Sequence, residues 1–191
     1  MHSVGTQRLE TSRLVLRRAT LADAEAMFRN WARDPVVTKF LTWQPYESEA
    51  DARAYIQGQI ELWEHDDDHY DWFIELKSLG EVIGTIGFVR QDEATQSFEV
   101  GYAIGRNWWG QGIVAEALAE VLRFAFEEIG ANRVGAQHDT ANPNSGKVMR
   151  KCGMVYEGTL RQAAKSNQGI VDVSQYSMLA EEYFANKRRE A

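Results

Sequence analysis

The sequence has one cysteine, no long apolar run and no excess of basic residues. Cys152 alone cannot form an intrachain disulfide, and it has no paired Cys/His spacing of a zinc site around it, so we expect a reducing, cytoplasmic setting. No stretch approaches the ~18 apolar residues of a membrane span, and residues 1–13 lack the apolar centre of a signal peptide. We therefore expect no membrane partner.

Positive charge is also scarce, because the formal net charge is −7. Binding to the phosphate backbone of nucleic acids needs a positive surface, so we expect no nucleic-acid partner. The one basic stretch, NKRREA at residues 186–191, is more typical of a short solvated terminus than of a binding site.

With 191 residues, 44% of them hydrophobic, the chain can bury one good core. We expect a single domain over residues 1–191, with its core at about 8–184. Hydrophobic periodicity predicts one strand–helix–strand crossover inside a mixed sheet, hence an α/β (α+β) fold. The predicted strands are 13–19, 72–77, 81–90, 97–105, 132–140, 154–164 and 170–179. The predicted helices are 20–34, 47–65, 142–153 and one whose apolar face runs from Val114 to Ala125.

The stretch GRNWWGQGIVAEAL, residues 105–118, is a turn that leads directly into a helix. The first N–H groups of such a helix have no partner, and the helix dipole favours an anion there. Gly110 and Gly112 would let a phosphate approach the backbone, so a pyrophosphate fits. The dinucleotide and nucleotide-hydrolase glycine patterns are both absent. The alternative is that the glycines only form a turn and that Trp108 and Trp109 only pack.

Four segments in this order resemble the GNAT superfamily of N-acetyltransferases, and within it the RimJ/RimL-like ribosomal-protein N-terminal acetyltransferases. They are LETSRLVLRRATLADAEAMF, FEVGYAIG, WWGQGIVAEAL and NPNSGKVMRKCGM. The resemblance implies a splayed sheet in which the fourth and fifth strands part to hold acetyl-CoA, and a monomer or homodimer. Residues 107–113 resemble the family's pyrophosphate loop, [Q/R]-x-x-G-x-[G/A], with Asn107 departing at its first position.

The resemblance also implies which residues contact the cofactor. They lie on the fourth strand, in the glycine loop and at the start of the late helix: Val100, Tyr102, Asn107, Trp109, Gly110, Gln111, Gly112, Ile113, Asn142 and Ser145. The reaction needs no metal.

Acetyl transfer to an amine needs a base, a stabilised oxyanion and a proton for the leaving thiolate. Glu99 is the first candidate base, with an outward-facing strand glutamate as its alternative reading, and His138 is the second candidate. An unpaired backbone N–H within residues 100–103 could stabilise the oxyanion.

The proton donor is expected in the late helix. Many superfamily members have a tyrosine there, but the matching position here is Met149. The resemblance points instead to the N-x-x-S pair Asn142 and Ser145, with Asn142 on the pantetheine arm and Ser145 at the sulfur or at a water on it. Helix capping is the alternative role of both residues.

The acceptor is an amine, expected at a protein or peptide N-terminus. Small amines (a polyamine or an amine-bearing antibiotic) and a catalytically silent acyl-CoA-binding module are the alternatives. RimL proteins have a glutamate where this chain has Ala164, which weakens the case for the same ribosomal acceptor. The run EHDDDHYD, residues 64–71, could ligate a metal through its two histidines, but such runs are more often solvated. An acidic rim of this kind could attract cationic acceptors.

Overall fold

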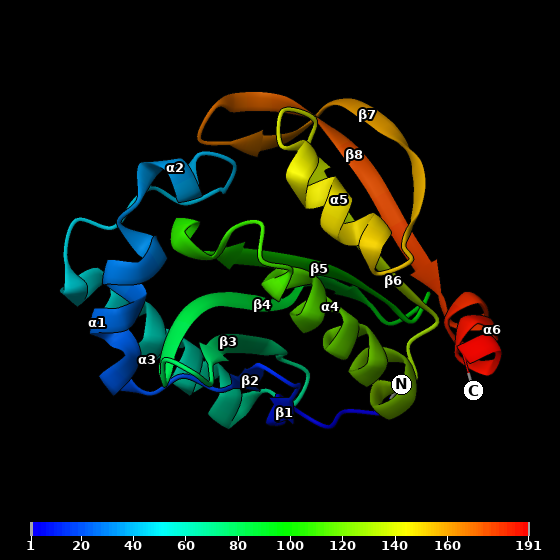
Figure 1. Ribbon diagram of the computed structural model, residues 1–191, viewed down its shortest axis with the longest axis horizontal. Helices are drawn as coiled ribbons and strands as arrows, with labels where there is room; N and C mark the ends of the chain where they lie inside the picture. Colours follow the sequence, from blue (N-terminus) through cyan, green and yellow to red (C-terminus); the bar gives the residue numbers. More distant parts are fainter. Residues whose placement is uncertain (1, 191) are drawn as a thin grey trace.

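The eight strands found in the described residues form one sheet, in the order β1-β2-β3-β4-β5-β6-β8-β7 (Figure 1). The computed structural model describes residues 2–190, so Met1 and Ala191, the ends of the predicted domain, lie outside it. The strands are β1 (Leu9–Glu10), β2 (Leu14–Arg17), β3 (Asp71–Leu76), β4 (Glu81–Asp92), β5 (Ser97–Ile104), β6 (Arg133–Asp139), β7 (Val155–Ser166) and β8 (Gly169–Leu179).

The strand pairings confirm the predicted mixed sheet. Strands β2 to β5 pair in sequence order and antiparallel, as expected for the three strands that follow residue 72. Strand β6 then pairs parallel to β5, after the crossover through α4. Strand β8 enters between β6 and β7, antiparallel to both. The fold is therefore of the mixed α/β class.

The helical segments follow the predictions except near residue 30 and at the C-terminus. Predicted helix 20–34 consists of a 3-10 turn, a short α-helix and a π-helical turn, and residues 180–190 form a helix that was not predicted, in which residues 186–189 are exposed as expected. The segments are η1 (Leu21–Asp23), α1 (Ala24–Met27), η2 (Phe28–Ala32), α2 (Pro35–Thr38), α3 (Glu49–His65), η3 (Arg106–Trp108), α4 (Ile113–Phe124), η4 (Ala125–Ile129), α5 (Pro143–Lys151) and α6 (Ala180–Glu190).

Each face of the sheet has its own hydrophobic core. One core lies under α4 and α5, which are drawn in front of the strands in Figure 1, and includes Phe98, Val100 and Leu118. The other core lies on the opposite face, under α1 and α3, and includes Trp31 and Phe73. Because side chains alternate along a strand, the residues of β5 between Phe98, Val100 and Tyr102 point to the second face. Within residues 2–190, no helix is long and apolar enough to cross a bilayer.

The start of α4 is attached to the β1–β2 turn through the carboxylate of Glu116. Thr11, Ser12 and Arg13 all donate hydrogen bonds to it, and Arg13 Nε lies 2.6 Å from Oε2. Burial alone would raise the pKa of Glu116, but these hydrogen bonds outweigh it and lower the pKa to about 2. This network fixes the first turn of α4 relative to the sheet.

Candidate active site

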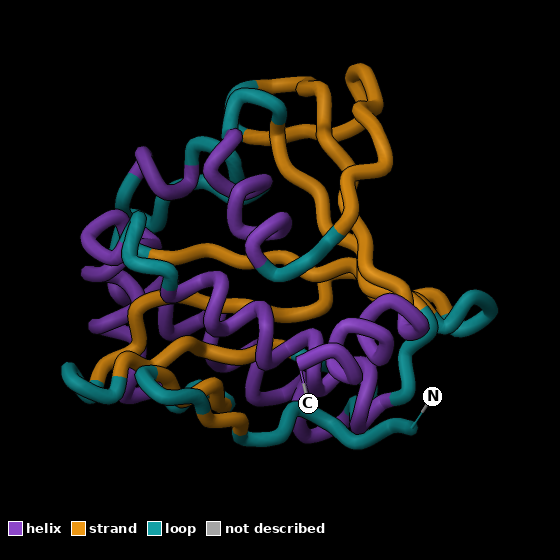
Figure 2. Tube along the Cα trace, turned by 45° about the vertical axis from the view of Figure 1, so that its right-hand side comes forward, coloured by secondary structure: helices purple, strands orange, loops and turns teal. Residues whose placement is uncertain are grey.

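The central feature of the site is the point where β5 and β6 stop pairing. Ser97 to Val100 pair with Arg133 to Ala136, and beyond that β5 pairs only with β4 while β6 pairs only with β8. The sheet therefore opens into two arms, with α5 lying between them in Figure 2. From Gly101 onward, the edge of β5 that faces β6 has no strand partner, so backbone polar groups are left available at the opening.

Two hydroxyl groups meet across this opening on the face covered by α5. Tyr102 OH lies 2.8 Å from Ser145 Oγ and 3.2 Å from the Ser145 carbonyl oxygen. Burial raises the pKa of Tyr102, so its hydroxyl keeps its proton at neutral pH. The pair links the middle of β5 to the first turn of α5 and puts two exchangeable protons at the opening.

The loop before α4 has the backbone conformation that only glycine adopts readily. Gly110 and Gly112 have φ angles of +74° and +73°. Gly112 is the N-cap residue of α4 and provides no side chain to cap it, so the N-terminal N–H groups remain for another partner. A Cβ at Gly112 would lie 3.4 Å from Lys151 Nζ and 3.8 Å from Arg13 Nη2. Two cations therefore flank this helix terminus.

Side chains of the loop brace it from within. Arg13 Nη1 donates to the Gln111 carbonyl at 3.0 Å, and Gln111 Nε2 donates to the Asn107 carbonyl at 2.9 Å. Trp109 Nε1 donates to the Ile104 carbonyl at 3.0 Å, although the residue is 46% exposed. The Asn107 carbonyl thus has a structural role in the loop.

Other predicted cofactor residues lie around the same groups. Ile113 and Val100 have buried side chains, so only their backbones could contact a cofactor. Asn142 is the N-cap residue of α5 without a capping side-chain bond, which leaves its amide available. Met149, at the position where a tyrosine was expected, is buried in the core below α4 and α5.

The two candidate bases lie on opposite faces of the sheet. Glu99 is two residues before Gly101 and points away from α5; its carboxylate lies 3.6 Å from Arg90 Nη1. His138 points to the α5 side, where its ring stacks on Tyr176 and its Nδ1 lies 2.7 Å from the Asp139 carbonyl oxygen. The structure therefore places the Tyr102–Ser145 pair and Glu99 on either side of the opening.

A ring of contacts surrounds the opening, and Asn167, in the β7–β8 turn, closes it. Asn167 Nδ2 donates to the carbonyls of Thr38 at 2.9 Å and Trp43 at 2.7 Å. Its backbone N–H donates to Leu41 O at 3.0 Å, and Gln44 Nε2 donates to its Oδ1 at 2.6 Å. The hairpin end thus attaches to the segment that follows α2, beside which it is drawn in Figure 1.

The other side of the ring is an ion pair. Arg106, just after β5, lies 3.2 Å from Asp34, the N-cap residue of α2. The ring therefore runs from β5 through η3, α2 and the β7–β8 hairpin to β6. These contacts bound the opening on the side of the β7–β8 hairpin.

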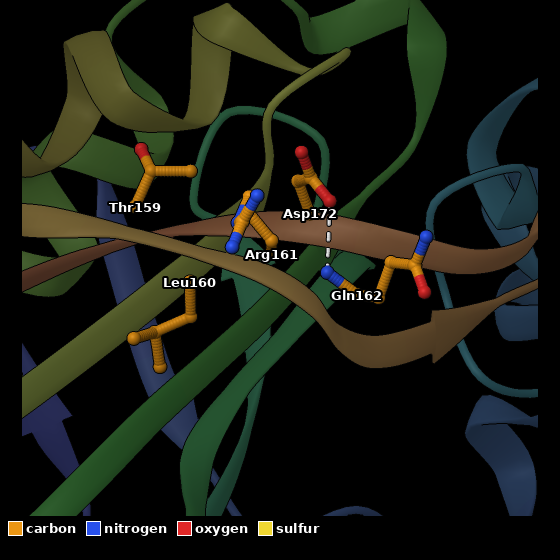
Figure 3. A pocket seen from close by; sticks show the side chains of 5 residues that line it. All are labelled: Thr159, Leu160, Arg161, Gln162 and Asp172. Atoms are coloured by element: carbon orange, nitrogen blue, oxygen red, sulfur yellow. Dashed lines mark hydrogen bonds between the residues drawn. The ribbon is translucent and has the colours of Figure 1, made fainter.

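The hairpin also has a hollow of about 690 Å³, lined by Thr159, Leu160, Arg161, Gln162 and Asp172 (Figure 3). It lies where β7 is irregular, between Leu160 and Ala164. Thr140 N donates to the Asp172 carbonyl, so the hollow lies beyond the end of β6.

The acidic run at 64–71 is not arranged as a metal site. Across the part of the chain that the structure describes, no three His, Cys, Asp or Glu side chains are grouped to hold a metal ion. His69 Nε2 lies 2.7 Å from Gln59 Oε1, and His65 Nδ1 lies 2.8 Å from the Glu61 carbonyl oxygen.

Sequence reasoning missed three features of this site. Arg13 and Lys151 reach the start of α4 from distant parts of the chain, and no local pattern marks them. Tyr102 was expected only as a cofactor contact, whereas its hydroxyl pairs with Ser145, 43 residues away. The alternation along β5 places Tyr102 on the same side of the strand as Val100, and this is a local signal that could have pointed to it.

Comparisons with known proteins agree with this geometry. The Acetyltransferase (GNAT) domain family matches residues 13–155. The uncharacterized N-acetyltransferase p20 of Bacillus licheniformis is 34% identical over 177 residues, covering 93% of this chain and 98% of its own. The ribosomal-protein-serine acetyltransferase of Escherichia coli is 30% identical over 140 residues, covering 73% and 76%.

A solved structure shows the same fold. RimL, a ribosomal alpha-N-protein acetyltransferase in complex with coenzyme A, superposes with a TM-score of 0.81 at 21% identity, covering 92% of this chain and 99% of that one. The chain therefore belongs to the GNAT family of acetyltransferases, in its RimJ/RimL-like branch, and is an N-acetyltransferase that takes its acetyl group from acetyl-CoA.

Proposed function

We propose that this enzyme acetylates the α-amine of a protein or peptide N-terminus, with Glu99 as base and the Tyr102–Ser145 pair as proton donor. The observation that carries the proposal is the opening between β5 and β6. It has hydroxyl groups on its α5 side and a carboxylate on the other, so an amine and a thioester entering from opposite faces would meet with both proton-transfer groups beside them.

The start of α4 fits the pyrophosphate of acetyl-CoA. The helix has no capping side chain, and both Lys151 Nζ and Arg13 Nη2 lie within 4 Å of the position of a Cβ on Gly112. Uncapped N–H groups and two cations together favour a doubly charged anion. When bound, acetyl-CoA supplies the carbonyl carbon that the amine attacks and the thiolate that leaves.

Each protein group then has one task. Glu99 accepts the proton of the acceptor amine, directly or through water. The unpaired backbone N–H groups within residues 100–103 stabilise the negative charge that develops on the carbonyl oxygen. Tyr102 or Ser145 gives a proton to the departing thiolate, and burial keeps the Tyr102 proton in place until then.

The α-amine is the preferred acceptor because it is easy to deprotonate. An α-amine with a pKa near ~8 requires about 1 kcal/mol to become neutral at pH 7, whereas a lysine side chain near ~10.4 requires about 4–5 kcal/mol. A single carboxylate can therefore deprotonate an α-amine more readily than a lysine side chain. The bounded opening also favours the slender end of a chain over a side chain on a folded surface.

Two relatives support this choice by name: the ribosomal-protein-serine acetyltransferase acts on a protein, and RimL is an alpha-N-protein acetyltransferase. A small linear amine, such as a polyamine, is the second candidate, because it would pass the same opening. We further propose a cytoplasmic location, in keeping with the single cysteine.

The test is thiol release from acetyl-CoA with a panel of free peptides, polyamines and amine-bearing antibiotics, followed by mass spectrometry of the products. We expect the label on peptide α-amines. Label only on lysine side chains or only on polyamines would overturn the N-terminal assignment. Tight acetyl-CoA binding without turnover on any amine would instead indicate a silent acyl-CoA-binding module.

A further inference from the structure

The face of the sheet that carries Glu99 has a second carboxylate with no part in the acetyl transfer described above. Asp71, the first residue of β3, accepts a hydrogen bond from Tyr55 OH at 3.3 Å, and no charged group of the described chain offsets its burial. That burial raises the pKa of Asp71 to about 7. Asp71 is half-buried by solvent exposure, and a partly desolvated carboxylate without a cation is unfavourable for folding unless a ligand supplies one.

The backbone around Asp71 places its carboxylate over β4, in the row of residues that leads to the opening. A Cβ on Gly87, its neighbour on β4, would lie only 2.5 Å from Asp71 Oδ1, so the side chain lies over β4 in space that only glycine leaves free. The next neighbour in the same row is Gly101 on β5, where the opening begins. The carboxylate is therefore one to two strand spacings from β5, about 5–10 Å.

Aromatic rings border the same position. Tyr55 lies on α3, and its ring centre is 6.4 Å from that of Phe73, two residues after Asp71. Burial, then the charge of Asp71 and the phenol of Tyr46, raise the pKa of Tyr55, so its hydroxyl remains a donor to the carboxylate at neutral pH. Aromatic faces and a carboxylate are the groups that attract an ammonium or guanidinium ion.

We propose that Asp71, positioned by Tyr55, binds a second cationic group of the acceptor, at a distance from the amine that is acetylated. This inference rests on the proposed function and narrows its substrate class to amines with another positive charge. The cation would be the far ammonium group of a linear polyamine or a lysine or arginine side chain near a peptide N-terminus. In either case, the cation of the acceptor is the charge partner that the protein itself does not provide for Asp71.

Steady-state kinetics with matched acceptors test this directly. Butylamine is compared with diamines of four to eight carbons, and the peptide Ala-Ala-Ala with Ala-Lys-Ala. For the wild type we expect a KM about tenfold lower for at least one dicationic acceptor than for its monocationic partner. Asp71→Asn should raise that KM about tenfold or more and leave both kcat and the KM for the monocation unchanged.

The matched control is Asp67→Asn, which removes the same charge from an exposed position of the same acidic run and should change neither KM. Tyr55→Phe, which keeps the carboxylate, should raise the KM for the dication by a smaller factor. A third measurement does not depend on turnover: calorimetry of the diamine on protein saturated with coenzyme A should show weaker binding in Asp71→Asn.

The outcomes separate the two proposals. If amines are acetylated but the wild type does not distinguish monocations from dications, the Asp71 site is refuted while the acetyltransferase function stands. Equal KM increases in Asp71→Asn and Asp67→Asn would also refute it, because general charge would then explain the effect. If no amine supports thiol release, the proposed function fails, and diamine binding by calorimetry still decides the role of Asp71.

Discussion

Replacing Gly112 by alanine separates backbone strain from cofactor binding at the start of α4. With φ at +73°, an alanine there is strained by about 1–2 kcal/mol, which in a chain of this size lowers Tm by about 2–8 °C. The new Cβ also projects between Lys151 Nζ and Arg13 Nη2, into the space where a phosphate would approach. Loss of one or two charge-assisted hydrogen bonds, about 1.5–3 kcal/mol each, should weaken acetyl-CoA binding about 10- to 10,000-fold.

Gly130→Ala is the matched control. Gly130 follows η4, far along the chain from the loop, has φ at +78°, and would place its Cβ in open space. Both variants should lose similar stability in calorimetric melting, but only Gly112→Ala should lose affinity in titrations with acetyl-CoA. Equal affinity of the wild type and a folded Gly112→Ala would refute the assignment of the pyrophosphate to this loop.

Three further outcomes follow from the site and its supports. Tyr102→Phe should lower kcat about 100-fold and leave the KM for acetyl-CoA nearly unchanged; a wild-type rate where chemistry limits would exclude the phenol as proton donor. Glu99→Gln should depress the rate most at neutral pH and recover partly as rising pH supplies neutral amine, so a uniform loss at all pH values would contradict its role as base. Because the folded pKa of Glu116 is below its unfolded value, its contribution to stability is complete above about pH 5 and lost as pH falls toward about 2. Chemical denaturation across that range should show a steeper loss for the wild type than for Glu116→Gln, and parallel curves would contradict the network around α4.

Most strands and helices could be predicted because the hydrophobic pattern of each segment indicates its secondary structure and its buried face. Alternation from Trp72 onward and the apolar stripe of α4 determine strands and helix without reference to the rest of the chain. Helix α6 was missed because its apolar side chains are few, and Tyr183 is held by a contact to Phe126 that no local pattern reveals. The formation of such a helix depends on contacts between residues that are far apart in the sequence.

In the candidate site, too, some residues could be found from local sequence and others depend on tertiary packing. The glycine loop and Glu99 were found from their neighbours in sequence, whereas the proximity of Lys151 to Gly112 depends on how α5 packs against α4. Asp71 was the clearest misreading. As the last residue of the acidic run at 64–71 it was taken with the solvated residues, but it is the first residue of β3, and its half-buried carboxylate lies over Gly87 of β4. The composition of residues 64–71 suggests one environment for all of them, but β3 begins at Asp71 and gives this residue different surroundings from the rest.

The hydrogen bonds of Asn167 are expected to set the equilibrium between a closed and an open form of the ring around the opening. Four hydrogen bonds close it, and at about 1 kcal/mol each we expect them to favour the closed form by about 4 kcal/mol, so that the ring would be open in roughly one molecule in a thousand. An acceptor narrow enough to pass the closed ring binds with its full intrinsic affinity. One that requires the open form has its apparent affinity reduced by that same factor of about a thousand. We therefore expect the turn at Asn167 to select acceptors by width, independently of the chemistry of the amine.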